Sequence, residues 1–320
     1  MIKIVYSNTK TYNGIKMYSL NLYSDLKKEL DVKLKPLPRI EIKLNGKKYG
    51  GWTSQRFLAW TAGNADIVHS ASHWDLAPHT NVVTIQDLFP LTLEVYREYT
   101  TDSRRRYNMR FLKIINEKRI KVIVPNPMIA DEVRKFISNA DITVIPSKIF
   151  VQLPTANPYP EDNKLHLLTI GEIHGDQPNR KLIYELYDWI KGLDNIDLYH
   201  IGKITDSKCL NYANNIHQLG QVDPQTKFNY LAYADKYVFK TLGEGQGYPV
   251  MEAMKLGTQP VINDLPEHRF FLGDYPYYYH NKDEFLEMIY KPKKTGLAEQ
   301  ISQYDNWIEK YKKVYEEVMG

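Results

Sequence analysis

The stretch Gly243–Asp274, GEGQGYPVMEAMKLGTQPVINDLPEHRFFLGD, carries the strongest local pattern in the sequence. Gly245 and Gly247 stand just before Pro249, and proline is favoured in the first turn of a helix. The helix predicted after this loop ends at Gly257, which suits a left-handed cap. A glycine-rich loop that enters a helix offers free backbone N–H groups and the positive end of the helix dipole. The pattern therefore predicts an anion site suited to a diphosphate.

Two acidic residues flank this loop. Glu244 precedes the glycines and Glu252 lies in the first turns of the helix, so both can face one cleft. Carboxylates do not bind phosphate, but they accept hydrogen bonds from the hydroxyl groups of sugars and ribose. We expect Glu252 to hold the ribose of a nucleotide, because it lies one turn inside the loop. The alternative is an ordinary strand–loop–helix cap with solvated glutamates, which does not explain the small residues between two acids.

Strand-like and helix-like segments alternate along both halves of the chain. In the first half the predicted strands are 2–6, 67–69, 82–85, 122–124 and 142–145, and the predicted helices are 17–30 and 102–121. In the second half the predicted strands are 165–170, 196–201, 237–239 and 259–262, and the predicted helices are 181–190, 224–232 and 249–255. This alternation is typical of βαβ units with a parallel sheet. We therefore predict an α/β protein with two Rossmann-like, doubly wound domains that face a central cleft.

A proline-rich break separates the two series. Its prolines favour extended chain and lack the N–H group that a sheet needs; they are Pro146, Pro154, Pro158 and Pro160. We predict an N-terminal domain over 1–150, a linker over 151–163 and a C-terminal domain over 164–303. The last helix, 304–320, is expected to pack back on the N-terminal domain.

Composition indicates an ordinary globular protein. With 320 residues, 43% apolar and 25% charged, the chain fits one large or two medium domains and is unlike a disordered chain. The one cysteine, Cys209, excludes an internal disulfide, and its polar neighbours predict a surface position. The nine histidines include no HExxH pattern, so no dedicated metal site is expected. Without a signal-like N-terminus or an apolar run near ~18 residues, we expect a cytoplasmic protein, soluble or peripherally attached to a membrane.

The string around Glu244 resembles glycosyltransferase family 4. The family pattern EGxGxPxxEAMxxGxPV is matched in register by Glu244, Gly245, Gly247, Pro249, Glu252, Ala253, Met254 and Gly257, with Tyr248 inside it, and Pro260 and Val261 follow one position later than in the pattern. The resemblance implies a GT-B fold with the donor bound by the C-terminal domain and the acceptor by the N-terminal domain. It also implies that Glu244 grips the hydroxyls of the transferred sugar.

Other segments match the family in the same order, so that the resemblance spans nearly the whole chain. Residues 168–171, followed by Asn179, Arg180 and Lys181, resemble the strand and basic loop that hold the donor diphosphate. Many members carry arginine directly after the glycine of this strand, and here that residue is Glu172. The departure leaves Arg180 and Lys181 to neutralise the diphosphate. Residues 219–222 and 264–267 resemble the family's LGxV strand and the loop after the next strand.

The N-terminal half carries weaker matches. Asn13-Gly14 resembles a reduced Gly-Gly turn that faces the donor phosphates, and residues 66–69 resemble a strand that ends in DxxH. Residues 83–91 resemble the TxHDxxPL stretch of mannosyltransferase-like members, with Gln86 in place of the usual histidine before Asp87. Glutamine can hydrogen-bond a sugar hydroxyl but cannot exchange a proton near neutral pH. A general base at Gln86 is therefore not expected.

The reaction that the resemblance implies is a retaining hexosyl transfer without a bound metal or other cofactor. A nucleoside-diphosphate sugar of the UDP or GDP type is the donor, and a hydroxyl of a sugar, a lipid-linked glycan or a protein is the acceptor. Departure and attack occur on one face of the sugar, and the leaving diphosphate helps to deprotonate the acceptor. This scheme tolerates Gln86, because it needs no enzymic base.

Other functions remain open. Residues 1–150 hold 24 basic against 14 acidic side chains, and the rest of the chain 18 against 24. The segment 104–119 contributes Arg104, Arg105, Arg106, Arg110, Lys113, Lys118 and Arg119, beside the apolar Phe111 and Ile115. It is a solvated face, a peripheral membrane contact or, least favoured, a nucleic-acid contact, since RNP-like aromatics are missing. A same-fold epimerase or phosphorylase is a further alternative, although no lysine motif for pyridoxal phosphate is evident.

Overall fold

The computed structural model describes residues 1–8, 14–38, 41–44, 47–50, 65–77, 79–96, 102–175 and 178–320. The chain forms two compact units, and each is considered by itself. Unit 1 comprises Met1–Thr92, Thr100–Ser147 and Asn306–Gly320, and unit 2 comprises Leu93–Tyr99 and Lys148–Asp305. The segment 151–163 groups with unit 2, where the Tyr159 hydroxyl donates to the Tyr230 carbonyl at 2.9 Å.

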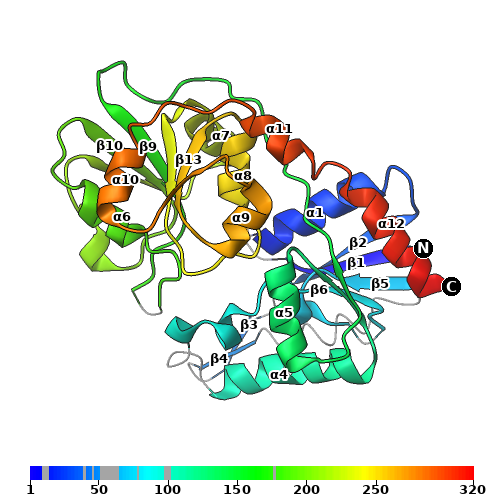
Figure 1. The fold of residues 1–320 in the computed structure, drawn as a ribbon. Helices are drawn as coiled ribbons and strands as arrows, with labels where there is room; N and C mark the ends of the chain where they lie inside the picture. Colours follow the sequence, from blue (N-terminus) through cyan, green and yellow to red (C-terminus); the bar gives the residue numbers. More distant parts are fainter. Residues whose placement is uncertain are drawn as a thin grey trace. The chain divides into compact units, whose positions relative to one another are not determined.

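Unit 1 is built on a six-stranded parallel sheet in the order β2-β1-β5-β6-β7-β8 (Figure 1). The strands are β1 (Ile2–Asn8), β2 (Val32–Pro38), β5 (Ile67–Ser70), β6 (Val82–Thr84), β7 (Lys121–Val124) and β8 (Ile142–Val144). A separate antiparallel pair is formed by β3 (Glu41–Leu44) and β4 (Lys47–Gly50). The helices are α1 (Gly14–Leu26), η1 (His73–Asp75), α3 (Phe89–Thr92), α4 (Asp102–Glu117), α5 (Pro127–Phe136) and α12 (Trp307–Met319). The chain thus enters the middle of the sheet at β1 and extends it in both directions.

Helices of unit 1 begin and pack as their sequences dictate. In α1, Tyr18, Leu22 and Leu26 are spaced by four residues, so they share one face and are all buried. In α5, the Asn126 side chain caps the helix by accepting from the Ile129 N–H at 2.8 Å. These contacts fix the helices on the sheet.

The C-terminal helix α12 belongs to unit 1, although unit 2 separates it from the rest of that unit in sequence. The Tyr311 and Tyr18 hydroxyls lie 2.7 Å apart, and the Tyr315 hydroxyl lies 2.8 Å from Nδ1 of His69. The Trp307 indole donates to Asp25 at 3.1 Å. The apolar stripe of this helix therefore carries hydroxyl and indole groups that meet buried polar partners.

Unit 2 has a second six-stranded parallel sheet, in the order β11-β10-β9-β12-β13-β14. The strands are β9 (Leu165–Ile170), β10 (Ile196–Ile201), β11 (Ile216–Gly220), β12 (Lys236–Phe239), β13 (Gln259–Asn263) and β14 (Tyr277–Tyr279). The helices are η2 (Glu94–Tyr96), α6 (Ile183–Ile190), η3 (Ser207–Cys209), α7 (Pro224–Tyr233), α8 (Tyr248–Lys255), α9 (Pro266–Leu272), α10 (Lys282–Met288) and α11 (Leu297–Ser302). This is the strand order of a doubly wound dinucleotide-binding sheet.

Both faces of the second sheet are covered by helices. Leu168 packs with residues of α7, α8, α9 and α11, whereas its neighbour Leu167 packs with residues of α6 and α10. Successive side chains of a strand point to opposite faces, so a strand covered on both sides reads as a continuous apolar run. The predicted fold class, two doubly wound α/β halves, is confirmed.

The sequence patterns did not predict every helix and strand of the structure. Strands β9 and β10 agree with the predicted bounds, while the first helix ends at Leu26 instead of residue 30. Elements without a sequence prediction are β2, β3, β4, α3, α5, α9, β14, α10, α11 and the 3-10 helices η1, η2 and η3. Most of them are too short for a repeating pattern to be recognised.

Candidate functional site

The strand order of unit 2 reverses between β9 and β12, because the chain runs from β9 to one edge and returns beside it. Ligands of doubly wound sheets bind at such a switch point, outside the carboxyl ends of the strands. The segment after β9 contains Arg180 and Lys181, and the loop after β12 contains Glu244, Gly245 and Gly247. The topology therefore brings both predicted donor-binding segments to one edge.

Backbone pairing joins these two segments directly. The Leu182 N–H donates to the Lys240 carbonyl at 2.9 Å, and the Leu242 N–H donates to the Arg180 carbonyl at 3.0 Å. An antiparallel bridge between Lys181 and Thr241 lies between these bonds. The two basic side chains are therefore anchored to the start of the glutamate loop.

Arg180 forms an ion pair with Glu244, with Nη1 and Oε1 2.9 Å apart. The same nitrogen donates to the Gly243 carbonyl, so the arginine holds both the backbone and the carboxylate of the loop. Burial would raise the pKa of Glu244, which is 8% exposed, but Arg180, Lys181 and His268 outweigh it and lower that pKa. The carboxylate is therefore ionised and poised to accept hydrogen bonds.

Lys181 lies against the end of β9. Its ammonium group is 3.4 Å from the Ile170 carbonyl and 5.2 Å from the centre of the Phe239 ring. A Cβ atom at Gly171 would come within 2.7 Å of the Lys181 side chain, so glycine makes room for it. Burial lowers the pKa of Lys181, and the charge of Glu244 opposes that shift. An anion bound beside this lysine would favour its charged form further.

Helix α8 begins at the end of the glycine loop. Gly247 precedes it in the left-handed region, with φ +73° and ψ 47°, where glycine carries no steric cost. Tyr248 and Pro249 form the first turn, in which proline loses no hydrogen bond. The N–H groups of a helix's first turn and the positive end of its dipole suit a diphosphate.

Glu252 is also buried, at 9% exposure, and has a partner that the sequence patterns missed. Lys227 of α7 lies 2.8 and 2.9 Å from its two carboxylate oxygens. Burial raises the pKa of Glu252, and the Lys227 ammonium partly offsets the shift. The charges of Glu244 and Glu252 both act on Lys181, as does that of Arg180. The four charged residues predicted for the site in unit 2, Arg180, Lys181, Glu244 and Glu252, thus form one electrostatic group.

Hydrogen bonds from the end of β13 stabilise the loop after β12. The Asn263 side chain accepts from the Thr241 N–H at 3.0 Å and donates to the Thr241 carbonyl at 2.9 Å. The Asn263 carbonyl accepts from Nδ1 of His268 at 2.9 Å. Burial lowers the pKa of His268, and its hydrogen bond to Asn263 and the charge of Glu244 oppose that shift. His268 is a residue of the site that the motif comparison did not single out.

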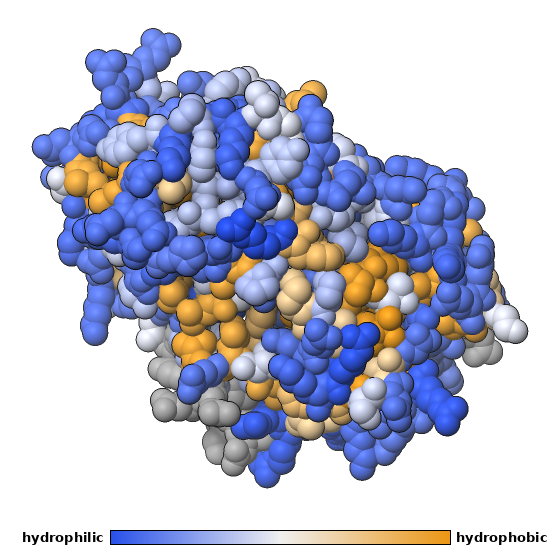
Figure 2. Space-filling model, in the orientation of Figure 1, coloured by the Kyte–Doolittle hydropathy of each residue, from blue (hydrophilic) through white to orange (hydrophobic). Residues whose placement is uncertain are grey.

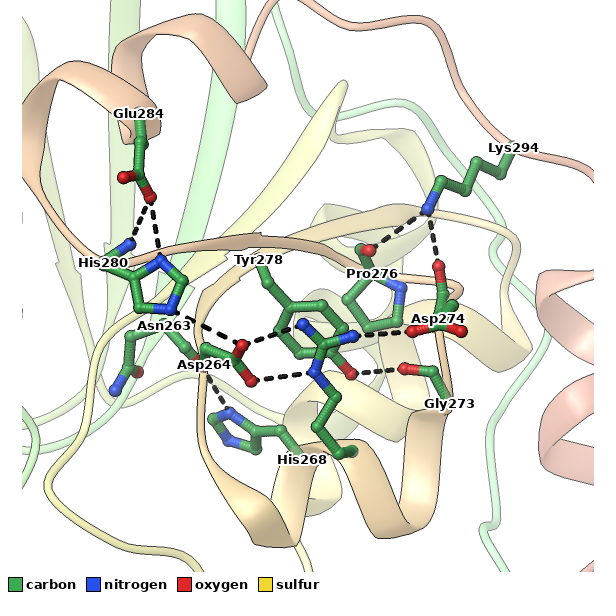
Figure 3. A network of polar contacts seen from close by, with 11 residues as sticks. Asn263, Asp264, His268, Gly273, Asp274, Pro276, Tyr278, His280, Glu284 and Lys294 are labelled. Carbon is green, nitrogen blue, oxygen red and sulfur yellow. Dashed lines mark hydrogen bonds and ion pairs between the residues drawn. The ribbon is translucent and has the colours of Figure 1, made fainter.

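A network of surface ion pairs supports the same region (Figure 3). Arg269 donates to both oxygens of Asp264 at 2.8 Å and to Asp274 at 2.6 Å, with its guanidinium 3.8 Å from the centre of the Tyr278 ring. His280 lies 3.6 Å from Asp264 on the other side. Asp264 is the first residue of the segment 264–267, which resembles a family loop. Its bidentate contact with Arg269 therefore fixes the start of this loop.

The remaining predicted residues lie in unit 1, after the carboxyl ends of β1 and β6, which β5 separates in the sheet. Gly14 is the first residue of α1, after β1, while Asn13 lies outside the described residues. Gln86 and Asp87 follow β6, and Asp87 accepts from the Phe89 N–H at 3.4 Å. Nε2 of Gln86 is buried without a hydrogen bond to any described residue. Its amide is therefore free to serve a ligand.

The segment 66–69, which resembles a DxxH strand, has its histidine inside unit 1. His69 is fully buried, and its ring nitrogens each lie 2.8 Å from a hydroxyl, those of Tyr315 and Thr84. Burial lowers the pKa of His69 to about 3. This histidine is neutral and joins the sheet to α12.

The basic segment forms helix α4, whose exposed side is hydrophilic at the bottom of Figure 2. Arg105, Arg106, Arg110 and Lys113 are exposed, whereas Phe111 and Ile115 are buried in unit 1. Those two apolar residues are therefore core residues and are not available to a membrane. Within the described part of the chain, every helix is too short or too polar to span a bilayer.

The prediction that Cys209 lies on the surface is wrong. This residue is 6% exposed and lies in the core with Ile183 and Tyr187. Its polar neighbours in sequence belong to η3, where one turn can bury a single side chain.

Comparisons with known proteins agree with this architecture, although no family model matches the sequence. The phosphatidyl-myo-inositol mannosyltransferase of Mycolicibacterium smegmatis is 25% identical over 244 residues, which are 71% of this chain and 61% of that protein. The chain thus spans less than two thirds of that relative's length.

Solved structures are similar over almost their full length. WaaG, a glycosyltransferase involved in lipopolysaccharide biosynthesis, has a TM-score of 0.74 at 15% identity, with 100% of both chains covered. HepE of Anabaena, in complex with UDP-glucose, has a TM-score of 0.68 at 12% identity, with 99% of both covered. Together with the two six-stranded sheets, these similarities establish the GT-B fold of glycosyltransferase structures.

Proposed function

We propose that this protein is a retaining glycosyltransferase, similar to family 4, that moves a hexose-type sugar from a UDP- or GDP-sugar to a hydroxyl acceptor. The acceptor is a sugar, a lipid-linked glycan or a protein. The observation that carries the proposal is the electrostatic group at the switch point, where Arg180 and Lys181 meet Glu244 beside the start of α8.

Each residue has a role in this scheme. Arg180 and Lys181 neutralise the diphosphate together with the N–H groups of the Gly245–Pro249 turn. Glu244 accepts hydrogen bonds from the hydroxyls of the transferred sugar, and Glu252 from those of the ribose. The combination of cations, helix start and carboxylates matches a donor that carries both a diphosphate and hydroxyls.

In the transfer, the bond between the anomeric carbon and the diphosphate oxygen breaks, and a bond from that carbon to the acceptor oxygen forms on the same face. The proton of the acceptor hydroxyl passes to the leaving diphosphate. Gln86 and Asp87 are assigned to hydrogen bonds with the reacting sugars; the free amide of Gln86 fits a hydroxyl partner. Protein cations take the place of a metal ion at the diphosphate, so we expect metal-independent transfer.

Similar proteins support the chemistry. The mannosyltransferase relative is named for transfer of a hexose to a phosphatidyl-inositol acceptor, and HepE was solved with UDP-glucose. Both fit a nucleoside-diphosphate hexose as the donor. The exposed cations of α4, Arg105, Arg106, Arg110 and Lys113, support a peripheral contact with an anionic membrane that carries a lipid-linked acceptor.

Calorimetric titration with UDP-, GDP- and ADP-sugars tests the donor, followed by product analysis of the donor that binds. We expect one nucleotide class to bind and its sugar to be released or transferred, also in EDTA. Binding to none of these donors contradicts the proposal. Rearrangement of the sugar while it stays on the nucleotide identifies an epimerase instead, and a strict need for Mg²⁺ or Mn²⁺ rules out the metal-independent scheme.

A further inference from the structure

A second cluster of polar side chains lies at the other end of the unit 2 sheet from the glutamate loop. His166, Asp197 and His217 are each the second residue of a strand, on β9, β10 and β11, which are neighbours. Asp162 precedes β9. Since the strands are parallel, all four residues gather at the amino ends, whereas donors bind at the carboxyl ends.

The ligand atoms of Asp162, His166 and Asp197 are close enough to share one ion, and His217 lies beside Asp197. Oxygens of Asp162 and Asp197 and a ring nitrogen of His166 all lie within 4.8 Å of one another. Nε2 of His166 is 3.1 Å from Asp162 Oδ1, and Nε2 of His217 is 3.3 Å from Asp197 Oδ1. Neighbouring ligands of a tetrahedral zinc ion are about 3.3 Å apart when each lies about 2.0 Å from the metal.

The buried atoms of this cluster lack the partners that they need. His166 is 7% exposed, and Nε2 of neither His166 nor His217 forms a hydrogen bond with any residue that the structure describes. The Asp197 carboxylate is 4% exposed, and a buried carboxylate requires a cation. Lys164 supplies one charge, 3.2 Å from Asp197 Oδ1, but its side chain is 40% exposed and free to turn to solvent. A cation between Asp162, His166 and Asp197 would satisfy the His166 nitrogen and the Asp197 carboxylate.

Aromatic rings hold the two imidazoles in place. His166 stacks on Tyr159 at 5.0 Å with an interplanar angle of 10°, and His217 stacks on Tyr199 at 4.6 Å and 23°. Tyr199 also meets Tyr159 edge-on at 4.8 Å. The ring orientations are therefore set by packing before any ion binds, which reduces the entropy lost on binding.

We propose that Asp162, His166 and Asp197 form a binding site for Zn²⁺ or a divalent transition ion of the same kind. One imidazole and two carboxylates form a ligand set that zinc accepts, with water in the fourth position, while Mg²⁺ prefers six oxygen ligands. The ion would link the segment before β9 to β9 and β10. It stabilises unit 2 and takes no part in the transfer, because it lies away from the donor edge.

The test uses the purified full chain after treatment with a chelator. Zinc titration by calorimetry should give one site, Co²⁺ should give the visible absorption of tetrahedral coordination, and added Zn²⁺ should raise the unfolding temperature while Mg²⁺ does not. Asp162→Asn and His166→Gln each change one ligand, and Asp162→Asn keeps the side-chain oxygen that accepts from the Lys164 N–H. Each should weaken zinc binding by about tenfold or more.

His280→Ala is the matched control, because His280 is an exposed histidine beside the carboxylates Asp264 and Glu284. It should bind zinc like the parent. Circular dichroism establishes that each variant is folded. Failure of the parent to bind one equivalent overturns the proposal, as do folded Asp162→Asn and His166→Gln variants with parental affinity, or equal loss in His280→Ala. Those results would leave the cluster as a set of ion pairs completed by Lys164.

Discussion

Arg180 and Glu244 form an ion pair 2.9 Å long between two loops that follow different strands of one sheet. Without a donor, this pair satisfies two buried charges. A bound diphosphate would compete with Glu244 for Arg180, and the carboxylate would gain sugar hydroxyls in exchange. The pair therefore keeps both groups ionised and oriented before the donor arrives, and that preorganisation underlies the following predictions.

Glu244→Gln should keep nucleotide affinity and lower the rate of transfer. The charged hydrogen bonds matter most when the sugar develops positive character, so a cost of about 2–4 kcal/mol in the activation barrier is expected. Calorimetry measures the binding of the free nucleotide, and product analysis measures turnover. Glu287→Gln, which changes an exposed glutamate of α10, is the control and should behave like the parent. Parental turnover in Glu244→Gln would leave Glu244 a structural residue of the loop.

Glu252→Ala should weaken binding of the free nucleotide by about 1–3 kcal/mol, because it removes a charged acceptor for the ribose. Lys227→Met should make that binding more sensitive to acid, since the ammonium opposes the burial that raises the pKa of Glu252. Binding curves between pH 5 and 8 provide the measurement. Lys291→Met removes an exposed lysine from its pair with Glu287 and should leave the curve unchanged. Nucleotide affinity that stays parental in Glu252→Ala removes Glu252 from the site.

Arg180→Ala with Lys181→Ala should abolish turnover and weaken the nucleoside diphosphate far more than the nucleoside. Both cations are assigned to the diphosphate, which the nucleoside lacks. Titration with UDP and uridine, or the matching guanine pair, compares the two losses. Lys191→Ala with Lys291→Ala removes two lysines from exposed ion pairs and serves as the control. Equal losses for both ligands point to a folding defect of the Arg180 loop.

Sequence patterns anticipated the elements whose burial is continuous. Strands β9 and β10 are covered on both faces and read as apolar runs, so their bounds were predictable. The glycine loop before α8 was predictable because the left-handed conformation of Gly247 and the proline in the first turn are requirements of the local sequence. By contrast, β14 consists of three tyrosines, which fit a strand or an interface equally well.

The residues that contact the predicted site residues were harder to predict from the sequence. Lys227 meets Glu252 only because α7 and α8 pack together, and no spacing rule links those positions. His166, Asp197 and His217 are separated by whole βα units, so they resemble isolated residues until parallel strands align them. Contacts of this kind depend on topology, which a motif does not contain.

Buried neutral histidines predict a loss of stability in acid. Burial lowers the pKa of His200 in unit 2 and of His73 in unit 1 to about 4 each, against 6.5 in an unfolded chain. The unfolded state therefore takes up a proton first as the pH falls below 6.5. Stability is complete above that pH and is lost progressively down to about pH 4, by about 3 kcal/mol for each histidine.

His200→Gln tests this dependence in unit 2. Nε2 of His200 donates to the Gly171 carbonyl at 2.7 Å, and a glutamine amide can donate there without titrating. Native-state hydrogen exchange of the β10 amides at pH 7.5 and pH 5 should show a smaller acid loss in the variant than in the parent, by about 2 kcal/mol. His280→Gln changes an exposed histidine of the same unit and should retain the parental loss. An acid loss that is as large in His200→Gln as in the parent would show that His200 is not the group whose protonation destabilises unit 2.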